Sequence, residues 1–177
     1  LLDNGVQVGG ATLSASDITA GYVDISLSGL ATGSHSFSGK IADQAVNPSV
    51  ASVALAVVID TAAPTAPIIN TIAGNDFVNA SEKGAGITVS GTAEAGASVA
   101  VTWGDVTKTV TATGGNWTTS FAAGEVPADG NTILSATATD VAGNVSAAGT
   151  RTITIDATAP SASAVITGAA DNVEPTL

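Results

Sequence analysis

A five-residue phrase that occurs twice sets the strongest limit on how this chain can fold. It reads Asp-Thr-Ala-Ala-Pro at Asp60–Pro64 and Asp-Ala-Thr-Ala-Pro at Asp156–Pro160. Each copy follows an apolar, β-branched run, which is typical of a strand that ends at the aspartate. The two aspartates are 96 residues apart, which is about the length of one β-sandwich domain. The repeat therefore predicts β-modules in tandem, with this linker phrase as the connection between them.

Between the two linker phrases, short β-prone runs alternate with turn signals. Apolar residues recur there with a period of two, which is typical of half-buried strands. The expected strands cover residues 67–72, 87–92, 98–103, 108–113, 115–121, 131–139 and 150–155. No stretch keeps a helical period over several turns. The pattern predicts an all-β chain of tandem immunoglobulin-like β-sandwich modules with no significant helix.

The spacing of the repeats divides the chain into three parts. Residues 61–156 form a complete immunoglobulin-like module. Residues 1–60 align with its second half, because 41–43 (Ile-Ala-Asp) falls opposite 138–140 (Ala-Thr-Asp). They predict a partial module that holds strands C to G. Residues 157–177 repeat the opening of the complete module and predict the start of a third immunoglobulin-like module.

The partial module predicts an exposed core. It lacks an equivalent of roughly residues 61–100, so we expect the chain to be a fragment that begins in the middle of a sandwich domain. Two strands would then be missing, which leaves an unpaired sheet edge. Asn4-Gly5 is a strong signal for a two-residue hairpin in this part.

Charge and cysteine content exclude several classes of function. Four Lys and Arg face fifteen Asp and Glu, for a net charge of −11. Nucleic acid and anionic membranes are therefore excluded as partners, because nothing could neutralise their phosphates. The absence of cysteine excludes disulfides and thiolate metal sites. No apolar run approaches the ~20 residues of a membrane span, so we expect no direct membrane insertion.

Three phrases carry a resemblance to a known family. They are Val89–Gly96, Ala136–Asn144 and Asp156–Pro160, and they resemble the bacterial Ig-like repeats of large biofilm-associated and RTX-type surface adhesins. The resemblance implies type I secretion and an extracellular place on the bacterial surface. It also implies extender segments that are stiffened by Ca²⁺ at module junctions and contact neighbouring repeats of the same chain. The chain departs from the family in module one, where residues 44–47 (Gln-Ala-Val-Asn) stand opposite 141–144 (Val-Ala-Gly-Asn).

Three carboxylates are expected to meet at the junction between modules one and two. In a sandwich, the B–C and F–G loops lie at the pole where the chain enters. Glu94 on the first loop and Asp140 on the second should therefore lie near the incoming Asp60. Ca²⁺ prefers six to eight oxygen ligands, mostly carboxylates and carbonyls. These three residues are candidate calcium ligands, with carbonyls and waters completing the shell.

A second set of candidate calcium ligands belongs to the opposite pole. Asp76 and Glu82 on the A–B loop should lie near Asp156 and the third module. The alternative is that all these carboxylates are solvated, or that they stabilise turns through side-chain hydrogen bonds to the backbone. Asp3, Asp105 and Asp129 are assigned to turns on that ground.

The function expected from these features is structural and not enzymatic. The predicted protein is an extender of a bacterial cell-surface adhesin that supports adhesion and biofilm formation. One alternative is a ligand-binding Ig-like module for carbohydrate or a host protein, although Trp103 and Trp117 fit a core better than a sugar-stacking platform. Another is an accessory domain of a secreted hydrolase. Self-association through the Ala/Val/Thr-rich strands remains open. His35 is the only histidine, so no zinc or nucleophile site can be built around it.

Overall fold

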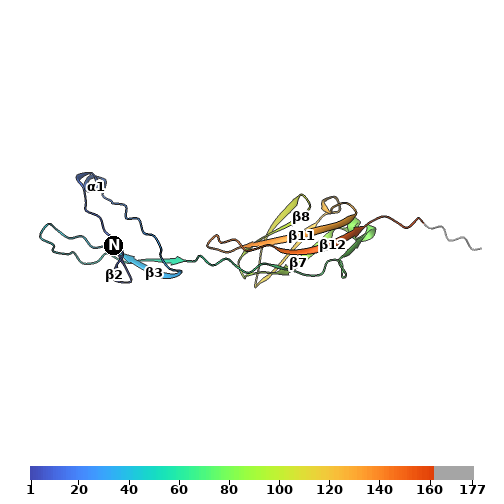
Figure 1. Cartoon of the computed structure of the whole chain (residues 1–177), viewed down its shortest axis with the longest axis horizontal. Coiled ribbons are helices and arrows are strands. Elements are labelled where there is room, and N and C mark those ends of the chain that lie inside the picture. The colour runs from blue at the N-terminus through green and yellow to red at the C-terminus, as the bar shows by residue number, and fades with distance from the viewer. Residues whose placement is uncertain (162–177) are drawn as a thin grey trace, which may run out of the picture.

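The computed structural model describes residues 1–161 and shows two folded parts arranged end to end (Figure 1). The N-terminal region (residues 1–60) lies at one end and the sandwich module (residues 61–156) at the other. A single extended segment joins them. The predicted start of a third module falls almost entirely outside the described residues.

The sandwich module consists of two β-sheets. One sheet has the strand order β10-β7-β5 and the other has the order β6-β12-β11-β8-β9. The strands are β5 (Ile68–Ile69), β6 (Phe77–Asn79), β7 (Ile87–Thr92), β8 (Ser98–Trp103), β9 (Val106–Thr111), β10 (Asn116–Phe121), β11 (Gly130–Thr139) and β12 (Gly149–Asp156). All pairs are antiparallel except β6 with β12. The predicted all-β immunoglobulin-like sandwich is confirmed, and β6 is the strand that the sequence pattern missed.

The core lies between the two sheets because alternate residues of their strands point inward. Strands β7, β8 and β11 bury every second side chain. Trp103 and Trp117 are both buried, and Trp103 meets the Phe121 ring edge-on at 5.5 Å between centroids. The prediction that both tryptophans belong to the core is confirmed. Neither indole is therefore available at the surface to stack on a sugar.

Two glycines allow backbone segments to approach closely in this module. A Cβ at Gly149 would lie 1.8 Å from the carbonyl oxygen of Pro67, and one at Gly91 would lie 1.9 Å from that of Ile68. Both contacts bring the incoming segment against the sheets. A side chain at either position would force the first strand away from the core.

The structure contains short helices where the sequence pattern predicted none. They are α1 (Ala15–Ala20), α2 (Ala80–Ala85) and the 3₁₀-helix η1 (Ala123–Glu125). Ser14 and Asp17 form a capping box for α1, and Asn79 and Glu82 form one for α2. A helix this short has no measurable 3.6-residue period, so only the capping residues could have indicated it.

The N-terminal region repeats half of the sandwich. Its strands β1 (Leu2–Asp3), β2 (Val6–Gln7), β3 (Gly33–Ser38) and β4 (Leu55–Ile59) form a sheet of order β2-β1-β3-β4. This order matches β9-β8-β11-β12 of the sandwich module. The predicted hairpin is present at Asn4 and Gly5, whose φ angles of 49° and 83° are those of a turn with two left-handed residues.

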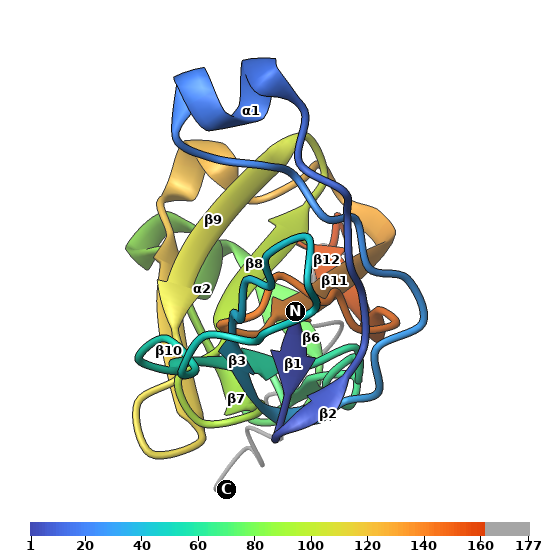
Figure 2. The same ribbon diagram turned by 90° about the vertical axis from the view of Figure 1, so that its left-hand side faces the viewer.

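Within the described part of the chain, no second sheet covers this region. Residues 8–32 contain α1, which projects away from the sheet (Figure 2), but no strand. The sequence also predicted a strand in residues 8–32 that would be the counterpart of β10, and this strand does not form. In the sandwich module β10 pairs with β7, and residues 1–60 contain no equivalent of β7. No residue from 1 to 63 is buried, as expected for a sheet without an opposing layer.

Side-chain contacts hold the open sheet together instead. His35 stacks on Phe37, and its Nδ1 lies 2.6 Å from Asp3 Oδ2. Its Nε2 lies 2.8 Å from the carbonyl oxygen of Ala31. Asp3 also accepts a hydrogen bond from the Ser36 amide, so it ties β1 to β3 and does more than form the adjacent hairpin.

No helix among residues 1–161 has the length and apolar character required to cross a bilayer.

Candidate functional site

The joint between the two parts is four residues long. Strand β4 ends at Ile59, and Pro64 is the first buried residue of the sandwich module, so residues 60–63 connect the two parts. Asp60 Oδ1 accepts a hydrogen bond of 2.9 Å from the Ala62 amide, which forms a local turn. Thr61 Oγ1 lies 2.7 Å from Thr32 Oγ1 of the N-terminal region. The first half of the joint is therefore tied back to the part that precedes it.

The second tie comes from a loop of the sandwich module. Asn144 donates from Nδ2 to the main-chain carbonyl of Asp60 at 3.1 Å. It also donates from Nδ2 to Asp140 Oδ2 and from its backbone amide to Asp140 Oδ1, both at 2.8 Å. The side chain of Asn144 thus connects Asp140 to Asp60. The hydrogen bond from the Asn144 side chain lowers the pKa of Asp140 below its usual value.

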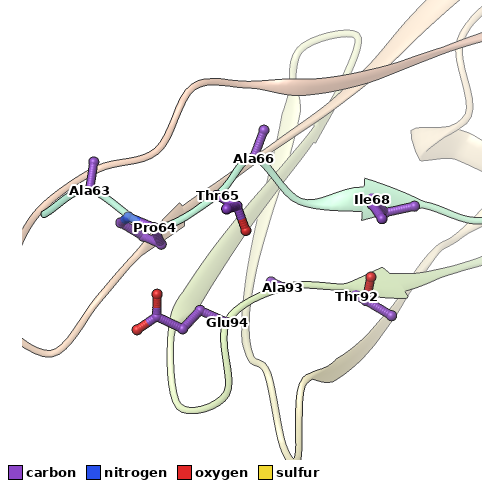
Figure 3. A pocket seen from close by; sticks show the side chains of 8 residues that line it. All are labelled: Ala63, Pro64, Thr65, Ala66, Ile68, Thr92, Ala93 and Glu94. Carbon is purple, nitrogen blue, oxygen red and sulfur yellow. The ribbon is translucent and has the colours of Figure 1, made fainter.

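Glu94 lies beside the same joint. It lines a shallow cavity of about 350 Å³ with Thr92, Ala93 and the segment Ala63–Ala66. Figure 3 shows its carboxylate below this segment, on the side of Ala63 and Pro64. Asp60 and Asp140 are thus linked through Asn144, and Glu94 faces the adjoining linker.

These carboxylates do not form a ready metal site. Among residues 1–161, no three His, Cys, Asp or Glu side chains lie close enough together to hold a metal ion. Asp140 uses both oxygens for Asn144, and Asp60 uses one for Ala62. Calcium binding at Asp60, Glu94 and Asp140 stays a prediction. It would require the carboxylates to move closer together around the ion.

At the opposite pole, protein side chains already supply positive charge. Arg151 contacts both carboxylate oxygens of Asp76 at 2.6 Å and donates to the Ile69 carbonyl at 2.9 Å. The guanidinium lowers the pKa of Asp76. Asp76 also accepts from the Ile72 amide. The structure thus places Asp76 in an ion pair that closes the loop before β6 onto β12.

The other two acidic residues predicted for that pole have local partners. Glu82 Oε2 accepts from the Asn79 amide as part of the α2 capping box. Asp156 Oδ1 accepts from the Thr158 amide at 3.2 Å. This bond repeats the turn that Asp60 forms with Ala62, so the two linker phrases share a local structure. Calcium binding by these two residues also stays a prediction.

Asp129 is the residue at this pole that sequence reasoning missed. It was assigned to a turn, but its Oδ2 accepts from Thr158 Oγ1 at 2.8 Å and from the Ala157 amide at 3.1 Å. Lys83 Nζ lies 3.7 Å from Asp129 Oδ1. The Thr158 hydroxyl is the main cause that lowers the pKa of Asp129. Asp129 therefore holds the outgoing linker phrase, and a Pro-Ala-Asp-Gly turn gives no sign of such a long-range contact.

Comparisons with known proteins agree with this architecture. Residues 73–157 match the model of the bacterial Ig-like domain family. The chain is 31% identical to a bacterial immunoglobulin-like domain from the M. primoryensis ice-binding adhesin, over 54% of this chain and 100% of that domain, with a TM-score of 0.44. It is 30% identical to a structure of a 1.5-MDa bacterial ice-binding adhesin, over 71% of this chain and 43% of that one, with a TM-score of 0.46.

A more distant similarity connects the chain to a biofilm-associated protein. Identity to the BSP domain of that protein is 22%, over 89% of this chain and 24% of that one, with a TM-score of 0.37. The chain thus spans less than half of this structure and of the 1.5-MDa adhesin structure. Comparison with curated proteins gave no significant match. With its sandwich module matched by the family model and fully covering a domain of 31% identity, the chain belongs to the bacterial Ig-like domain family.

Proposed function

We propose that this chain is an extender segment of a bacterial cell-surface adhesin. Its role would be to set how far from the cell, and in which direction, the binding domain of the adhesin is held. Its partners in this role are the neighbouring repeats of the same protein. Adhesion and biofilm formation would depend on it indirectly, because it would hold a binding domain away from the cell. The function is mechanical and requires no catalytic residue.

The joint is the observation that supports this proposal. Two folded parts lie end to end with four residues between them. The first two of these residues are hydrogen-bonded to both parts, Thr61 to Thr32 of the N-terminal region and the Asp60 carbonyl to Asn144 of the sandwich module. Pro64 and Pro67 are buried at the entrance to the sandwich module, which restricts the backbone further. A flexible linker would instead be rich in Gly and Ser and free of such contacts.

Calcium is proposed as a second stiffening element at this joint. Asp60, Glu94 and Asp140 would supply carboxylate oxygens to the ion, and Ca²⁺ would offset their mutual repulsion. One of the solved structures similar to this chain is described as a Ca²⁺-stabilized adhesin of an Antarctic bacterium. Sites of extracellular modules bind Ca²⁺ at about 10⁻⁴–10⁻³ M, so the joint would stiffen outside the cell. Export by type I secretion would fit such a protein.

Melting and small-angle scattering test the calcium proposal together. The chain is measured in EGTA and with Ca²⁺ at several millimolar, with Mg²⁺ as the control cation. We expect Ca²⁺ to raise the melting temperature and to narrow the distribution of end-to-end lengths. Asp60→Asn combined with Glu94→Gln should remove the response. Identical profiles in EGTA and Ca²⁺ would eliminate calcium from the mechanism.

A further inference from the structure

Among residues 1–161 the same loop occurs twice, and only one of the two copies contacts a linker phrase. In the N-terminal region, Asn47 donates to Asp43 Oδ1 from its amide at 2.9 Å and to Asp43 Oδ2 from Nδ2 at 3.0 Å. Asp43 N donates in return to the Asn47 carbonyl at 3.2 Å. The loop from Asp140 to Asn144 has the same three bonds at 2.8, 2.8 and 3.1 Å. The Asp-x-x-x-Asn loop is therefore a preformed unit in both parts.

A primary amide carries two N–H donors in one plane. Asn47 uses one of them for Asp43, and among the described residues its side chain has no second partner. Asn144 uses one for Asp140 and the other for the carbonyl oxygen of Asp60. The difference between the two loops is thus a single bond to a linker phrase.

We propose that the Asp-x-x-x-Asn loop is a coupling site that recognises the linker phrase of the neighbouring module through a main-chain carbonyl. In the joint seen here, Asn144 makes the contact, and Asp140 is a positioning residue that holds the Asn144 amide in the required orientation. The contact needs no cation. The inference rests on the proposed stiff joint. It attributes the relative orientation of the two modules to the neutral hydrogen bond between Asn144 and the Asp60 carbonyl.

The chemistry of the acceptor defines the partner. The loop contacts the main-chain carbonyl of Asp60, so its specificity does not depend on the side chain at that position. What it requires is a backbone turn that presents this carbonyl, and Asp60 forms that turn with Ala62. Asp156 forms the same turn with Thr158 in the second phrase. The loop at Asp43–Asn47 is accordingly complementary to an aspartate-to-proline linker phrase of another module.

The size of the effect decides which measurement can detect it. One neutral hydrogen bond shifts an equilibrium by roughly two- to ten-fold. That shift is too small to hold two separate chains together. It is large enough to restrict a four-residue joint whose first half is already tied to the N-terminal region. The expected signature is therefore a narrower spread of orientations and not a change in global stability.

Electron–electron distance measurements on the whole chain can test this directly. The chain has no native cysteine, so a pair of spin labels at Val58→Cys on β4 and Thr109→Cys on β9 has no background. Both positions are exposed. In EGTA, we expect a narrow distance distribution for the otherwise native chain and a clearly broader one for Asn144→Ala.

Asn47→Ala is the matched control, because it removes the same bonds within a loop that contacts no linker in the described part of the chain. It should leave the distribution unchanged, and circular dichroism should confirm that both variants are folded. Asp60→Asn removes a charge that a cation needs but keeps the main-chain carbonyl that Asn144 contacts, and its side-chain oxygen can still accept from the Ala62 amide. The distance distribution of this variant should therefore stay narrow in EGTA.

The outcomes separate this inference from the calcium proposal. A distribution for Asn144→Ala as narrow as that of the native loop would overturn the coupling site. A distance distribution of the native chain that is broad in EGTA and narrow only with Ca²⁺ would also overturn the coupling site, and it would support the calcium proposal. If the distribution of the native chain is equally narrow in EGTA and in Ca²⁺, and that of Asn144→Ala is broad in both, the coupling site is supported and calcium has no role at the joint.

Discussion

The N-terminal region and the sandwich module contain the same hairpin with different surroundings. Strands β3 and β4 pair as β11 and β12 do, and the loops between them share their hydrogen bonds. Leu134 on β11 is fully buried, whereas Phe37 at the matching place on β3 is only half-buried. The two residues have equivalent places in their sheets, because Leu134 lies opposite Trp103 of β8 and Phe37 lies opposite Asp3 of β1.

This comparison separates local from long-range causes of structure. The hairpin and its loop form wherever the local sequence supports them. The core forms only where a second sheet, here β10-β7-β5, covers the first. A hydrogen-bonded loop can therefore be identical in a region that has a core and in one that does not. The predictions below probe this contrast, starting from the largest expected effect.

Truncating the matched apolar residues should have very different costs. We expect Leu134→Ala to lower the free energy of unfolding by about 2–5 kcal/mol, because it leaves a cavity in a closed core. Phe37→Ala should cost about 1 kcal/mol or less, because its ring is already partly solvated. Urea unfolding followed by tryptophan fluorescence reports the first, since both indoles lie in the sandwich module. Amide hydrogen exchange in β3 and β4 reports the second.

Equal costs at the two positions would contradict the comparison. They would mean that the open sheet is covered in solution. Leu134→Ile is the control, because it keeps the volume and should cost less than about 1.5 kcal/mol.

The ion pair at the exit pole should contribute more than a surface pair in the same module. Arg151 contacts Asp76, Ile69 and Thr71, so Arg151→Met should lower the free energy of unfolding more than the loss of a single surface pair does. Lys108 forms a single carboxylate pair with Glu125, and its ammonium lies 5.6 Å from the centre of the Phe121 ring. Lys108→Met should cost about 1 kcal/mol or less. Chemical denaturation of both variants at one salt concentration gives the comparison, and an equal loss would show that Arg151 acts only as a surface charge.

The two loops should respond in opposite directions to substitution at one position. Val46 has a φ of 67° where Gly143 has a φ of 95°. A β-branched residue pays roughly 1–2 kcal/mol in this left-handed region. We therefore expect Val46→Gly to stabilise its loop and Gly143→Val to destabilise the other by about 1 kcal/mol. Hydrogen exchange at Asn47 and Asn144 measures both, and destabilisation by Val46→Gly would refute the strain argument.

The hairpins, sheets and core of the sandwich module could be predicted from the sequence, because alternation and turn residues act locally. Strands β7 and β8 begin and end as expected. Sandwich topology also indicates from the sequence that the loops of Glu94 and Asp140 lie near the linker, whereas the binding of an ion by these residues stays a prediction.

What could not be predicted depends on single long-range partners. Asp76 pairs with Arg151, and Asp129 holds Thr158. Nothing in the spacing of these residues indicates such contacts. In the sequence, Asn144 is only the last residue of a family motif, although its side chain makes the bond that spans the joint. The helices α1 and α2 were missed because a period cannot be measured over six residues.

The smallest expected effect is a difference in pH dependence between the two regions. Both ring nitrogens of His35 face acceptors, the Ala31 carbonyl and the Asp3 carboxylate, and these contacts raise the pKa of the imidazole. The stabilising contribution of His35 is therefore complete below about pH 6.5, its unfolded pKa, and is lost as pH rises through the higher folded value. The sandwich module should behave in the opposite way. Arg151 lowers the pKa of Asp76, so that contribution is complete above the unfolded value and is lost as pH falls through the folded one.

A pH titration followed by NMR can check both signs in one sample. Ring resonances of Phe37 should shift and broaden as pH rises above neutrality, because His35 stacks on that ring. Tryptophan fluorescence should stay constant over that range and change only in acid. His35→Gln should remove the response at high pH and leave the acid response intact, because no contact of His35 reaches the sandwich module. If both signals moved together, the two regions would unfold as one unit, and the separation between hairpin and core argued above would fail.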